Sequence, residues 1–180
     1  MRVLKIMIVM LVLIMSVGAV CAADDICDET ISYDGQDTLE ISQDDVYTAD
    51  EPSFADLATK IENATDTLDL TQDYKFNNET DNNAGIAIAK DNFVLNGNGF
   101  TIDANNQARI FNITANNVTL SNLVLINGNA EKGGAIYANG ALTLNNVTFI
   151  NNNASIGGAI GLYGNVTLVC NNSKFIDNDL

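Results

Sequence analysis

The sequence predicts an all-β protein: a right-handed parallel β-helix of about 24 residues per coil, with a short helix capping its N-terminal end. Three observations support this prediction. Short motifs recur about every 24 residues in the second half of the chain. The apolar segments inside each repeat are short and alternate with polar residues, which is typical of strands. Clusters of Asn and Gly separate these segments, and both residues tolerate the backbone conformations of tight turns.

The repeat is visible both as a motif and as two apolar series. Gly133-Gly134-Ala135-Ile136 returns 24 residues later as Gly157-Gly158-Ala159-Ile160. Each apolar series keeps nearly the same period, so we expect each to form a column of inward-facing side chains. The first series is Leu70, Leu95, Leu120, Leu144 and Leu168, and the second is Ile86, Ile110, Ile136 and Ile160.

Stacking is what makes such short units stable. A unit of about 24 residues with short strands cannot bury its apolar face alone, but a stack of units can. We expect about three strands per coil, with residues 67–180 forming about four coils and a truncated fifth. Asn side chains at equivalent turns can then hydrogen-bond to the Asn of the next coil. The right-handed sense follows from the general chirality of parallel connections.

The C-terminal end of the stack is expected to be open. Phe175 follows Phe149 by 26 residues, which indicates two inserted residues around Cys170 and Asn171. The spacing of the earlier motifs would place the next Gly-Gly-Ala-Ile near position 183, beyond Leu180. A stack that ends within a coil presents an unpaired strand edge, which promotes association. We therefore expect self-association through the C-terminal coil.

Residues 52–66 are expected to contain the capping helix. Ser53 and Asp56 have the spacing of a capping box, and Pro52 precedes them. The apolar residues that follow recur at helical spacing and define one face: Phe54, Leu57, Ala58 and Ile61. A short amphipathic helix needs an apolar surface to cover, and the first coil offers one.

Residues 1–23 have the pattern of a signal peptide. A basic start is followed by an apolar run from Ile6 to Val20 and by small residues before Asp24. We expect cleavage after these small residues. An uncleaved anchor and a lipid attached to Cys21 are alternatives. All three interpretations place the mature chain outside the cytoplasm.

Residues 24–51 are expected to form an acidic linker, because they contain 11 acidic residues and no basic one. This segment supplies much of the net charge of −15. By contrast, residues 82–180 contain 5 acidic and 4 basic residues and are nearly neutral. Calcium binding by the linker carboxylates is an alternative, but no loop there has the spacing of a defined calcium motif.

Several kinds of chemistry are disfavoured by composition. The chain has no His, so it lacks His-based acid–base catalysis and His-ligated metal sites. A pI of about 4.1 argues against nucleic-acid binding. Glycan-cleaving β-helix enzymes need clustered carboxylates, but Asp103 and Glu131 do not share a position in the repeat. We therefore expect no catalytic residues, no metal site and no cofactor.

The segment Phe149-Ile150-Asn151-Asn152, followed by Gly157-Gly158-Ala159-Ile160, resembles the paired FxxN and GGAI motifs of the polymorphic outer-membrane protein repeat. That repeat occurs in chlamydial surface adhesins and in adhesin-like proteins of methanogenic archaea. The coil with Leu125 and Gly128 departs from the FxxN motif. The residues that carry the repeat motif here are Gly133, Gly134, Ile136, Phe149, Asn152, Gly157, Gly158, Ile160, Phe175 and Asn178.

If the chain is exported, it can be glycosylated and its cysteines can be oxidised. Asn-x-Ser/Thr sequons, which are candidate glycosylation sites, begin at Asn63, Asn78, Asn112, Asn117, Asn146, Asn153, Asn165 and Asn171. Cys27 and Cys170 remain after signal cleavage, either as an oxidised pair or as two unrelated thiols.

The export pattern and the resemblance together imply a secreted or cell-surface, adhesin-like module without catalytic activity. The expected partners are glycans or the surface of a host or neighbouring cell. Two alternatives stay open: a fragment of a larger structural stalk, and a β-helix polysaccharide lyase or hydrolase.

Overall fold

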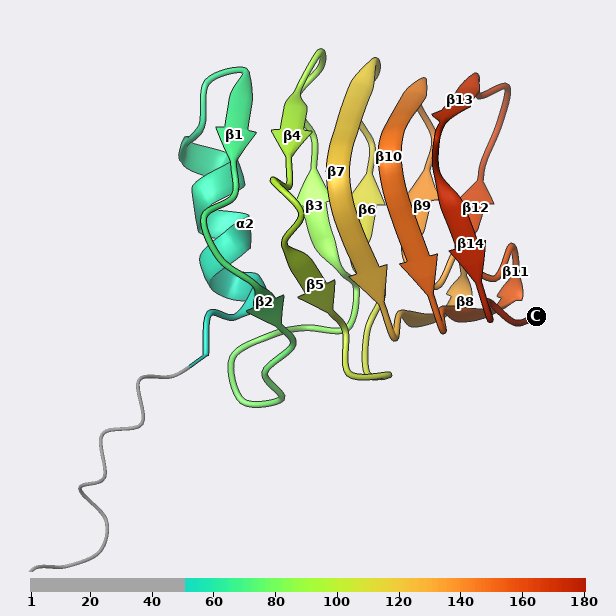
Figure 1. Ribbon diagram of the computed structural model, residues 1–180, viewed down its shortest axis with the longest axis horizontal. Helices are drawn as coiled ribbons and strands as arrows, with labels where there is room; N and C mark the ends of the chain where they lie inside the picture. Colours follow the sequence, from blue (N-terminus) through green and yellow to red (C-terminus); the bar gives the residue numbers. More distant parts are fainter. Residues whose placement is uncertain (1–50) are drawn as a thin grey trace, which may run out of the picture. The chain divides into compact units, whose positions relative to one another are not determined.

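The computed structural model describes residues 51–180 (Figure 1). The expected signal peptide and nearly all of the acidic linker lie outside the described residues. The described elements are α2 (Phe54–Asn63), β1 (Thr67–Asp69), β2 (Tyr74–Lys75), β3 (Ile86–Ile88), β4 (Val94–Asn96), β5 (Thr101–Asp103), β6 (Phe111–Ile113), β7 (Val118–Ile126), β8 (Asn129–Lys132), β9 (Ile136–Ala138), β10 (Leu142–Ile150), β11 (Asn153–Ile156), β12 (Ile160–Leu162), β13 (Leu168–Asn171) and β14 (Lys174–Ile176).

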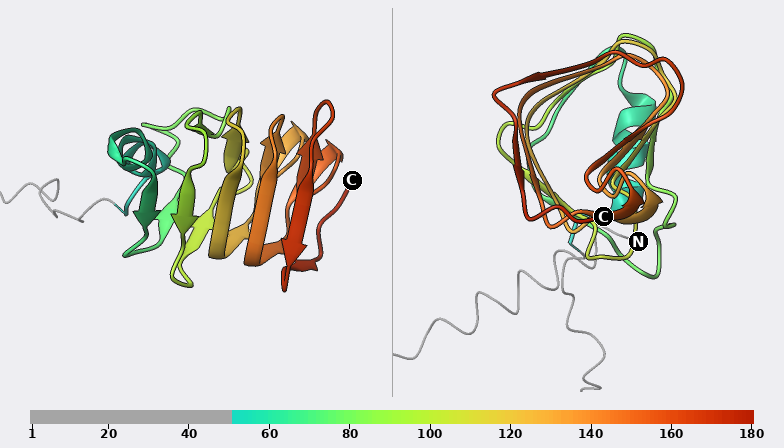
Figure 2. Two further views of the ribbon diagram at one scale, coloured as in Figure 1. Left: turned by 90° about the horizontal axis from the view of Figure 1, so that it is seen from above. Right: turned by 90° about the vertical axis from the view of Figure 1, so that its right-hand side faces the viewer.

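All the strand pairs are parallel, and the predicted β-helix is confirmed. The first sheet follows the order β1-β4-β7-β10-β13 and also includes β2, β5 and β14. The second sheet joins β3, β6, β9 and β12, and the third joins β8 and β11. The front strands β7 and β10 run downward, β3 and β6 run upward behind them, and the chain advances to the right (Figure 1). This is the predicted right-handed sense, and the coils overlie one another when viewed along the axis (Figure 2).

The centre of the stack has the register that the apolar series predicts. Leu95, Leu120 and Leu144 pair in one column. The prediction for Leu70 was wrong, because Leu68 is the residue that pairs with Leu95. The prediction for Ile110 was also wrong by one residue, since Phe111 lies between Ile86 and Ile136 in the second sheet.

The C-terminal register also differs from the prediction. Leu168 pairs with Leu142, and Cys170 pairs with Leu144. Because Ile160 still pairs with Ile136 at a spacing of 24, the two extra residues lie between β12 and β13. A shift of two residues keeps the same side chains facing inward, so apolar alternation alone could not locate the insertion.

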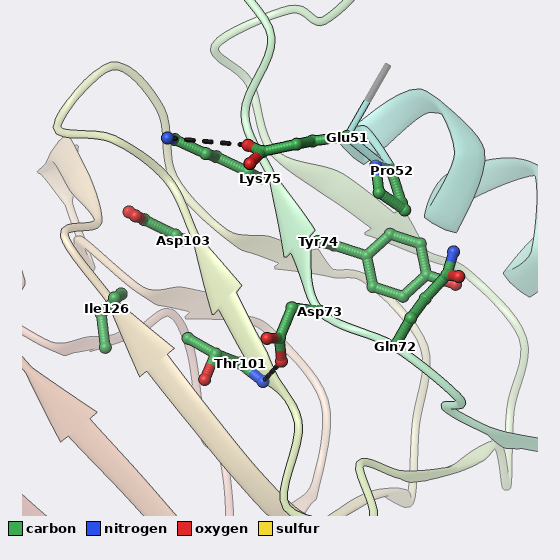
Figure 3. A pocket seen from close by; sticks show the side chains of 9 residues that line it. All are labelled: Glu51, Pro52, Gln72, Asp73, Tyr74, Lys75, Thr101, Asp103 and Ile126. Atoms are coloured by element: carbon green, nitrogen blue, oxygen red, sulfur yellow. Dashed lines mark hydrogen bonds and ion pairs between the residues drawn. The ribbon is translucent and has the colours of Figure 1, made fainter. Parts of the chain in front are cut away.

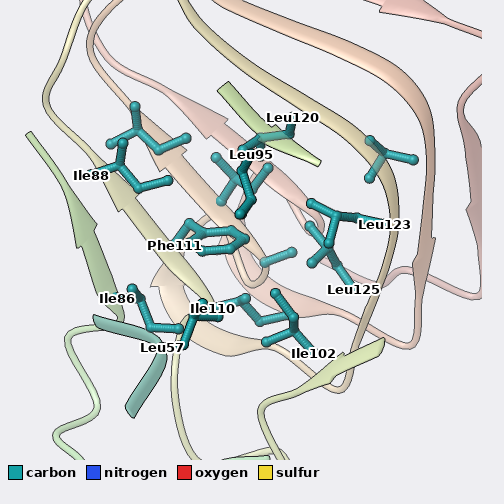
Figure 4. Close-up of a cluster of buried hydrophobic side chains, with 14 of the residues drawn as sticks. Leu57, Ile86, Ile88, Leu95, Ile102, Ile110, Phe111, Leu120, Leu123 and Leu125 are labelled. Carbon is teal, nitrogen blue, oxygen red and sulfur yellow. The ribbon is translucent and has the colours of Figure 1, made fainter. Parts of the chain in front are cut away.

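A single apolar core runs along the axis (Figure 4). The long strands β7 and β10 contribute most to it, with four buried side chains each. Leu95, Leu120 and Phe111 are each 0% exposed. Burying a side chain of this size stabilises the fold by roughly 1.5–3 kcal/mol. The stack therefore gains stability from each added coil, as expected for a solenoid.

Helix α2 covers the N-terminal end of this core (Figure 1). Its capping box is present: the Ser53 hydroxyl accepts from the Asp56 amide, and the Asp56 carboxylate accepts from the Ser53 amide. Leu57 is completely buried and lies beside Ile86 in Figure 4. The Asp81 carboxylate accepts hydrogen bonds from the first two helical amides, at 3.0 and 2.8 Å, which ties the helix start to the first coil.

The capping box predicts a specific pH dependence. Hydrogen bonds from the Ser53 amide and hydroxyl lower the pKa of the Asp56 carboxyl. The stability from this group is therefore present above the unfolded value of about 3.9 and is lost as the pH falls through the lower folded pKa. Ser53→Ala should raise the pKa of Asp56 toward its usual value, measured by carboxyl NMR titration. Identical titration curves in the two proteins would contradict this account.

Candidate functional site

The FxxN asparagine Asn152 links its own coil to both neighbours. Its side chain is completely buried. The Asn152 Oδ1 accepts from the Gly128 amide at 2.8 Å, and its Nδ2 donates to the Leu125 carbonyl at 3.0 Å. The Nδ2 group also donates to Asn178 Oδ1 at 2.9 Å. All the hydrogen-bonding groups of this amide are therefore used to join consecutive coils.

Asn178 repeats this arrangement one coil later. Its Oδ1 accepts from the Asn152 amide at 3.0 Å, and its Nδ2 donates to the Phe149 carbonyl at 3.1 Å. The two motif phenylalanines, Phe149 and Phe175, stack with ring centroids 4.8 Å apart. Phe149 is buried, whereas Phe175 is 51% exposed because no coil covers its outer face in the described structure.

Gly128 replaces the asparagine where the sequence departs from the motif, and the structure explains why. A Cβ at Gly128 would collide with the Gly134 carbonyl and would lie 2.7 Å from Asn152 Oδ1. The side chain of Asn152 occupies the space beside Gly128. The absence of a side chain at this position therefore lets the next coil approach.

The GGAI motif forms the corner before the second sheet. Gly133 and Gly157 have φ angles of +57° and +71°, in the left-handed region that glycine adopts most readily. Gly134 and Gly158 lie where adjacent coils touch, since the Gly134 amide donates to the Gly158 carbonyl at 2.6 Å. The motif isoleucines Ile136 and Ile160 then enter paired strands facing the core. These motif residues thus gather at the corners and at the ends of strands, where they hold coils together.

Asparagine ladders follow the outer corners, as the repeat predicts. The side-chain Nδ2 of Asn146 donates to Asn122 Oδ1 at 2.9 Å, and the Nδ2 of Asn122 donates to Asn96 Oδ1 at 3.1 Å. Asn96 in turn donates to Asp69 Oδ1 at 2.8 Å. Four coils are therefore joined by one row of amide hydrogen bonds.

The asparagines of the sequons divide into two groups, according to whether the side-chain nitrogen that would carry a glycan donates a hydrogen bond. Four of them donate that N–H group to another residue: Asn63, Asn117, Asn146 and Asn171. Within the described part of the chain, the side-chain hydrogen bonds include none from that nitrogen of the other four: Asn78, Asn112, Asn153 and Asn165. Glycosylation at the second group would break no hydrogen bond of the fold.

An acidic groove lies beside β2, β5 and the end of β7, with a volume of about 490 Å³ (Figure 3). Glu51 and Lys75 form an ion pair at 3.7 Å on its rim. Asp73 accepts from the Thr101 amide at 2.7 Å, and Asp103 accepts from Asn127 and from the Asn105 amide. Both carboxylates thus hold the main chain or a neighbouring side chain in place. In the described structure these two carboxylates accept from amide groups and are not hydrogen-bonded to each other.

Arg109 has a structural role that the sequence reasoning missed. Its guanidinium donates to the Lys132 carbonyl at 2.9 Å and to the carbonyls of Gly133 and Ala84 at 3.2 and 3.3 Å. It therefore joins three consecutive coils. The signal for this role was present, because Ala84, Arg109 and Gly133 are spaced by 25 and 24 residues.

Other candidate groups are few in residues 51–180. No cluster of three His, Cys, Asp or Glu side chains could hold a metal ion there. No helix in this range is both long and apolar enough to span a membrane. Cys170 is exposed on β13, while Cys27 lies outside the described residues, so their pairing stays a prediction. Comparisons with protein-family models, with curated proteins and with solved structures found no match.

Proposed function

We propose that this chain is an exported, non-catalytic β-helix module that binds glycans or cell surfaces. One observation carries the proposal: the central strands β7 and β10 present aligned pairs of polar side chains on the outer side of the first sheet. Thr119 pairs with Thr143, and Ser121 pairs with Asn145. Adjacent strands are spaced by about 4.8 Å, so the rows form a regular grid of donors and acceptors.

A rigid grid of this kind suits an extended hydroxylated polymer. The side chains are held by strands whose inward neighbours are buried, so little conformational entropy is lost on binding. Each contact is weak, but the two central coils contribute several contacts at once. The export pattern of residues 1–23 supports a location where such polymers are found.

Binding and turnover should be measured together on the exported chain. We expect retention of glycans or whole cells without product formation. Thr119→Lys with Thr143→Lys should abolish retention, because two long side chains would interrupt the rows. Thr65→Lys, an exposed change outside the sheet, is the matched control. Glycan cleavage by the purified chain would favour the lyase or hydrolase alternative, and no binding to cells or to a broad glycan panel would contradict the proposal.

A second function, self-association, is favoured by a group of exposed apolar side chains on the last described coil. The exposed large apolar side chains of the described chain all belong to its last 25 residues: Ile156, Leu162, Tyr163, Val169, Phe175, Ile176 and Leu180. The opposite end is covered by α2, so a head-to-tail contact is blocked. The partner that fits is a second copy meeting this one tail to tail, which closes as a two-fold dimer rather than a fibre.

Light scattering tests this association. The chain should be dimeric at micromolar concentration, and Phe175→Asp should shift it to monomer. Leu162→Asp provides the same test without disturbing the Phe149–Phe175 stack. Asn78→Asp, which adds the same charge to an exposed turn of the first coil, should remain dimeric. A monomeric parent chain, or dimers that survive both substitutions at the open end, would exclude this contact.

A further inference from the structure

A guanidinium group and two tyrosine rings form a row on the outer side of the second sheet. The Arg109 guanidinium carbon lies 5.1 Å from the centroid of the Tyr137 ring. The Tyr137 and Tyr163 rings are tilted by 37°, with centroids 6.5 Å apart. Because these residues belong to three successive coils, the row runs along the axis. We call Arg109, Tyr137 and Tyr163 the aromatic row.

The row is held in place by the fold. Arg109 is fixed by its hydrogen bonds to carbonyl groups on the coils before and after its own. Tyr137 on β9 has Gly161 of β12 as its register partner. A Cβ at Gly161 would lie 3.2 Å from Tyr137 Cδ2, so the missing side chain leaves room for the ring. A ligand would therefore meet a preorganised surface.

Tyr163 lies at the edge of the exposed apolar group of the last described coil and contacts Tyr137 in the aromatic row. It is 65% exposed and follows the end of β12. Its contact is with the partly exposed Tyr137 rather than with the core. Exposed aromatic pairs with a nearby cation are typical of binding surfaces, since Tyr and Arg dominate the energetics of recognition.

Charge narrows the class of ligand. In residues 51–180 the only ion pair joins Lys75 to Glu51, so Arg109 has no carboxylate partner there. Its described hydrogen-bond acceptors are all neutral carbonyl groups, and they leave two of its five N–H groups unused. A partly buried cation without a counter-charge favours an anionic ligand, and the rings favour one with an apolar ring face.

We propose that the aromatic row binds a pyranose polysaccharide that carries carboxylate groups. One sugar ring would pack its C–H face on the tyrosines, while a carboxylate would accept from the free N–H groups of Arg109. The inference rests on the proposed function in one respect, since both take a carbohydrate as the ligand. The two surfaces themselves are separate, because the aromatic row and the Thr119–Thr143 grid lie on different sheets.

The acidity of the whole chain does not oppose this assignment. Most acidic residues precede residue 82, and the row belongs to the nearly neutral part of the sequence. At 0.15 M salt, repulsion between exposed charges is screened over about 8 Å. An exposed acidic group therefore opposes an anionic ligand only when it lies within about this distance of the row.

Calorimetric titration of the exported chain, produced in a host that attaches no glycans, tests the proposal. Polygalacturonate is the acidic probe, and its fully methyl-esterified form is the matched neutral probe. We expect the ester to bind at least about tenfold more weakly, and Tyr163→Ala to weaken polygalacturonate binding by about tenfold. Val169→Ala, which trims another exposed apolar residue at the same end, is the control.

The outcomes separate this site from the proposed function. Equal binding of the two probes, or unchanged binding by Tyr163→Ala, would overturn the aromatic row as an acidic-sugar site. If polygalacturonate does not bind but the Thr119–Thr143 grid still retains another glycan, this inference fails and the proposed function stands. Because Tyr163 packs outside the core, circular dichroism of Tyr163→Ala should match that of the parent chain.

Discussion

Gly133→Ala should destabilise the β-helix by about 4 kcal/mol or more, enough to unfold a domain of ordinary stability. Two costs combine at this corner. The φ of +57° places any L side chain in the left-handed region, which costs about 1–2 kcal/mol. The new Cβ would also lie 2.6 Å from the Gly161 amide nitrogen and still closer to the Ile136 carbonyl. Both neighbours are main-chain atoms of paired strands, so neither can move without breaking the stack.

Gly99→Ala is the matched control for backbone strain. Its φ is +88°, but no atom lies within 4 Å of the position that a Cβ would take. We therefore expect a loss of only about 1–2 kcal/mol, from the backbone term alone. Urea denaturation of the two variants measures the difference. If both lose the same stability, the tight coil-to-coil approach at Gly133 is not what makes glycine necessary there.

The same glycines made the fold predictable from the sequence. Gly133 and Gly157 recur at 24 residues because the two coils turn with the same left-handed backbone and leave no room for a Cβ at this corner. The inward leucines Leu95, Leu120 and Leu144 recur because each fills the same layer of the core. Identity at a fixed spacing is therefore a direct consequence of stacking.

The register at the two ends was harder to predict, for a physical reason. Leu68 and Leu70 are both inward candidates two residues apart, and so are Leu168 and Cys170. Apolar alternation shows which residues of a strand face inward, but it does not distinguish between two registers that differ by two residues. The choice depends on the loops between β12 and β13 and between β2 and β3, whose lengths differ from coil to coil.

The aromatic row could not be found by motif at all. Arg109, Tyr137 and Tyr163 come from three coils, and Tyr163 follows its strand instead of lying within it. No two of them share a repeat motif. Their proximity depends on the register of the second sheet and on the missing side chain of Gly161, which become visible only in three dimensions.

Asn152→Ala should cost about 3–5 kcal/mol, because it leaves buried groups without partners. The Gly128 amide and the Leu125 carbonyl both lose the hydrogen bond that the side chain of Asn152 provides. Each unsatisfied buried group costs about 1–3 kcal/mol, and the space vacated by the amide adds to this loss. Urea or thermal unfolding, followed by circular dichroism, measures the change.

Asn178→Ala is the control, since it removes the same motif residue where water can reach. Asn178 makes equivalent bonds to the Asn152 amide and the Phe149 carbonyl, but it is only partly buried. Water can replace those bonds, so its loss should be about 1 kcal/mol. Comparable losses in the two variants would show that burial does not set the value of this asparagine.

Asn152→Asp tests the effect of a buried negative charge at the same position. The carboxylate keeps an acceptor for the Gly128 amide but places a second oxygen against the Leu125 carbonyl and Asn178 Oδ1. Buried without a counter-charge, it must bind a proton to fold, which raises its folded pKa above the unfolded one. The destabilisation should therefore be greatest at neutral pH and diminish as the pH falls toward about 4. A pH-independent loss of stability would mean that the coil opens locally and lets water reach this side chain. In that case Asn152 would stabilise the fold through the packing of its side chain and not through its buried hydrogen bonds.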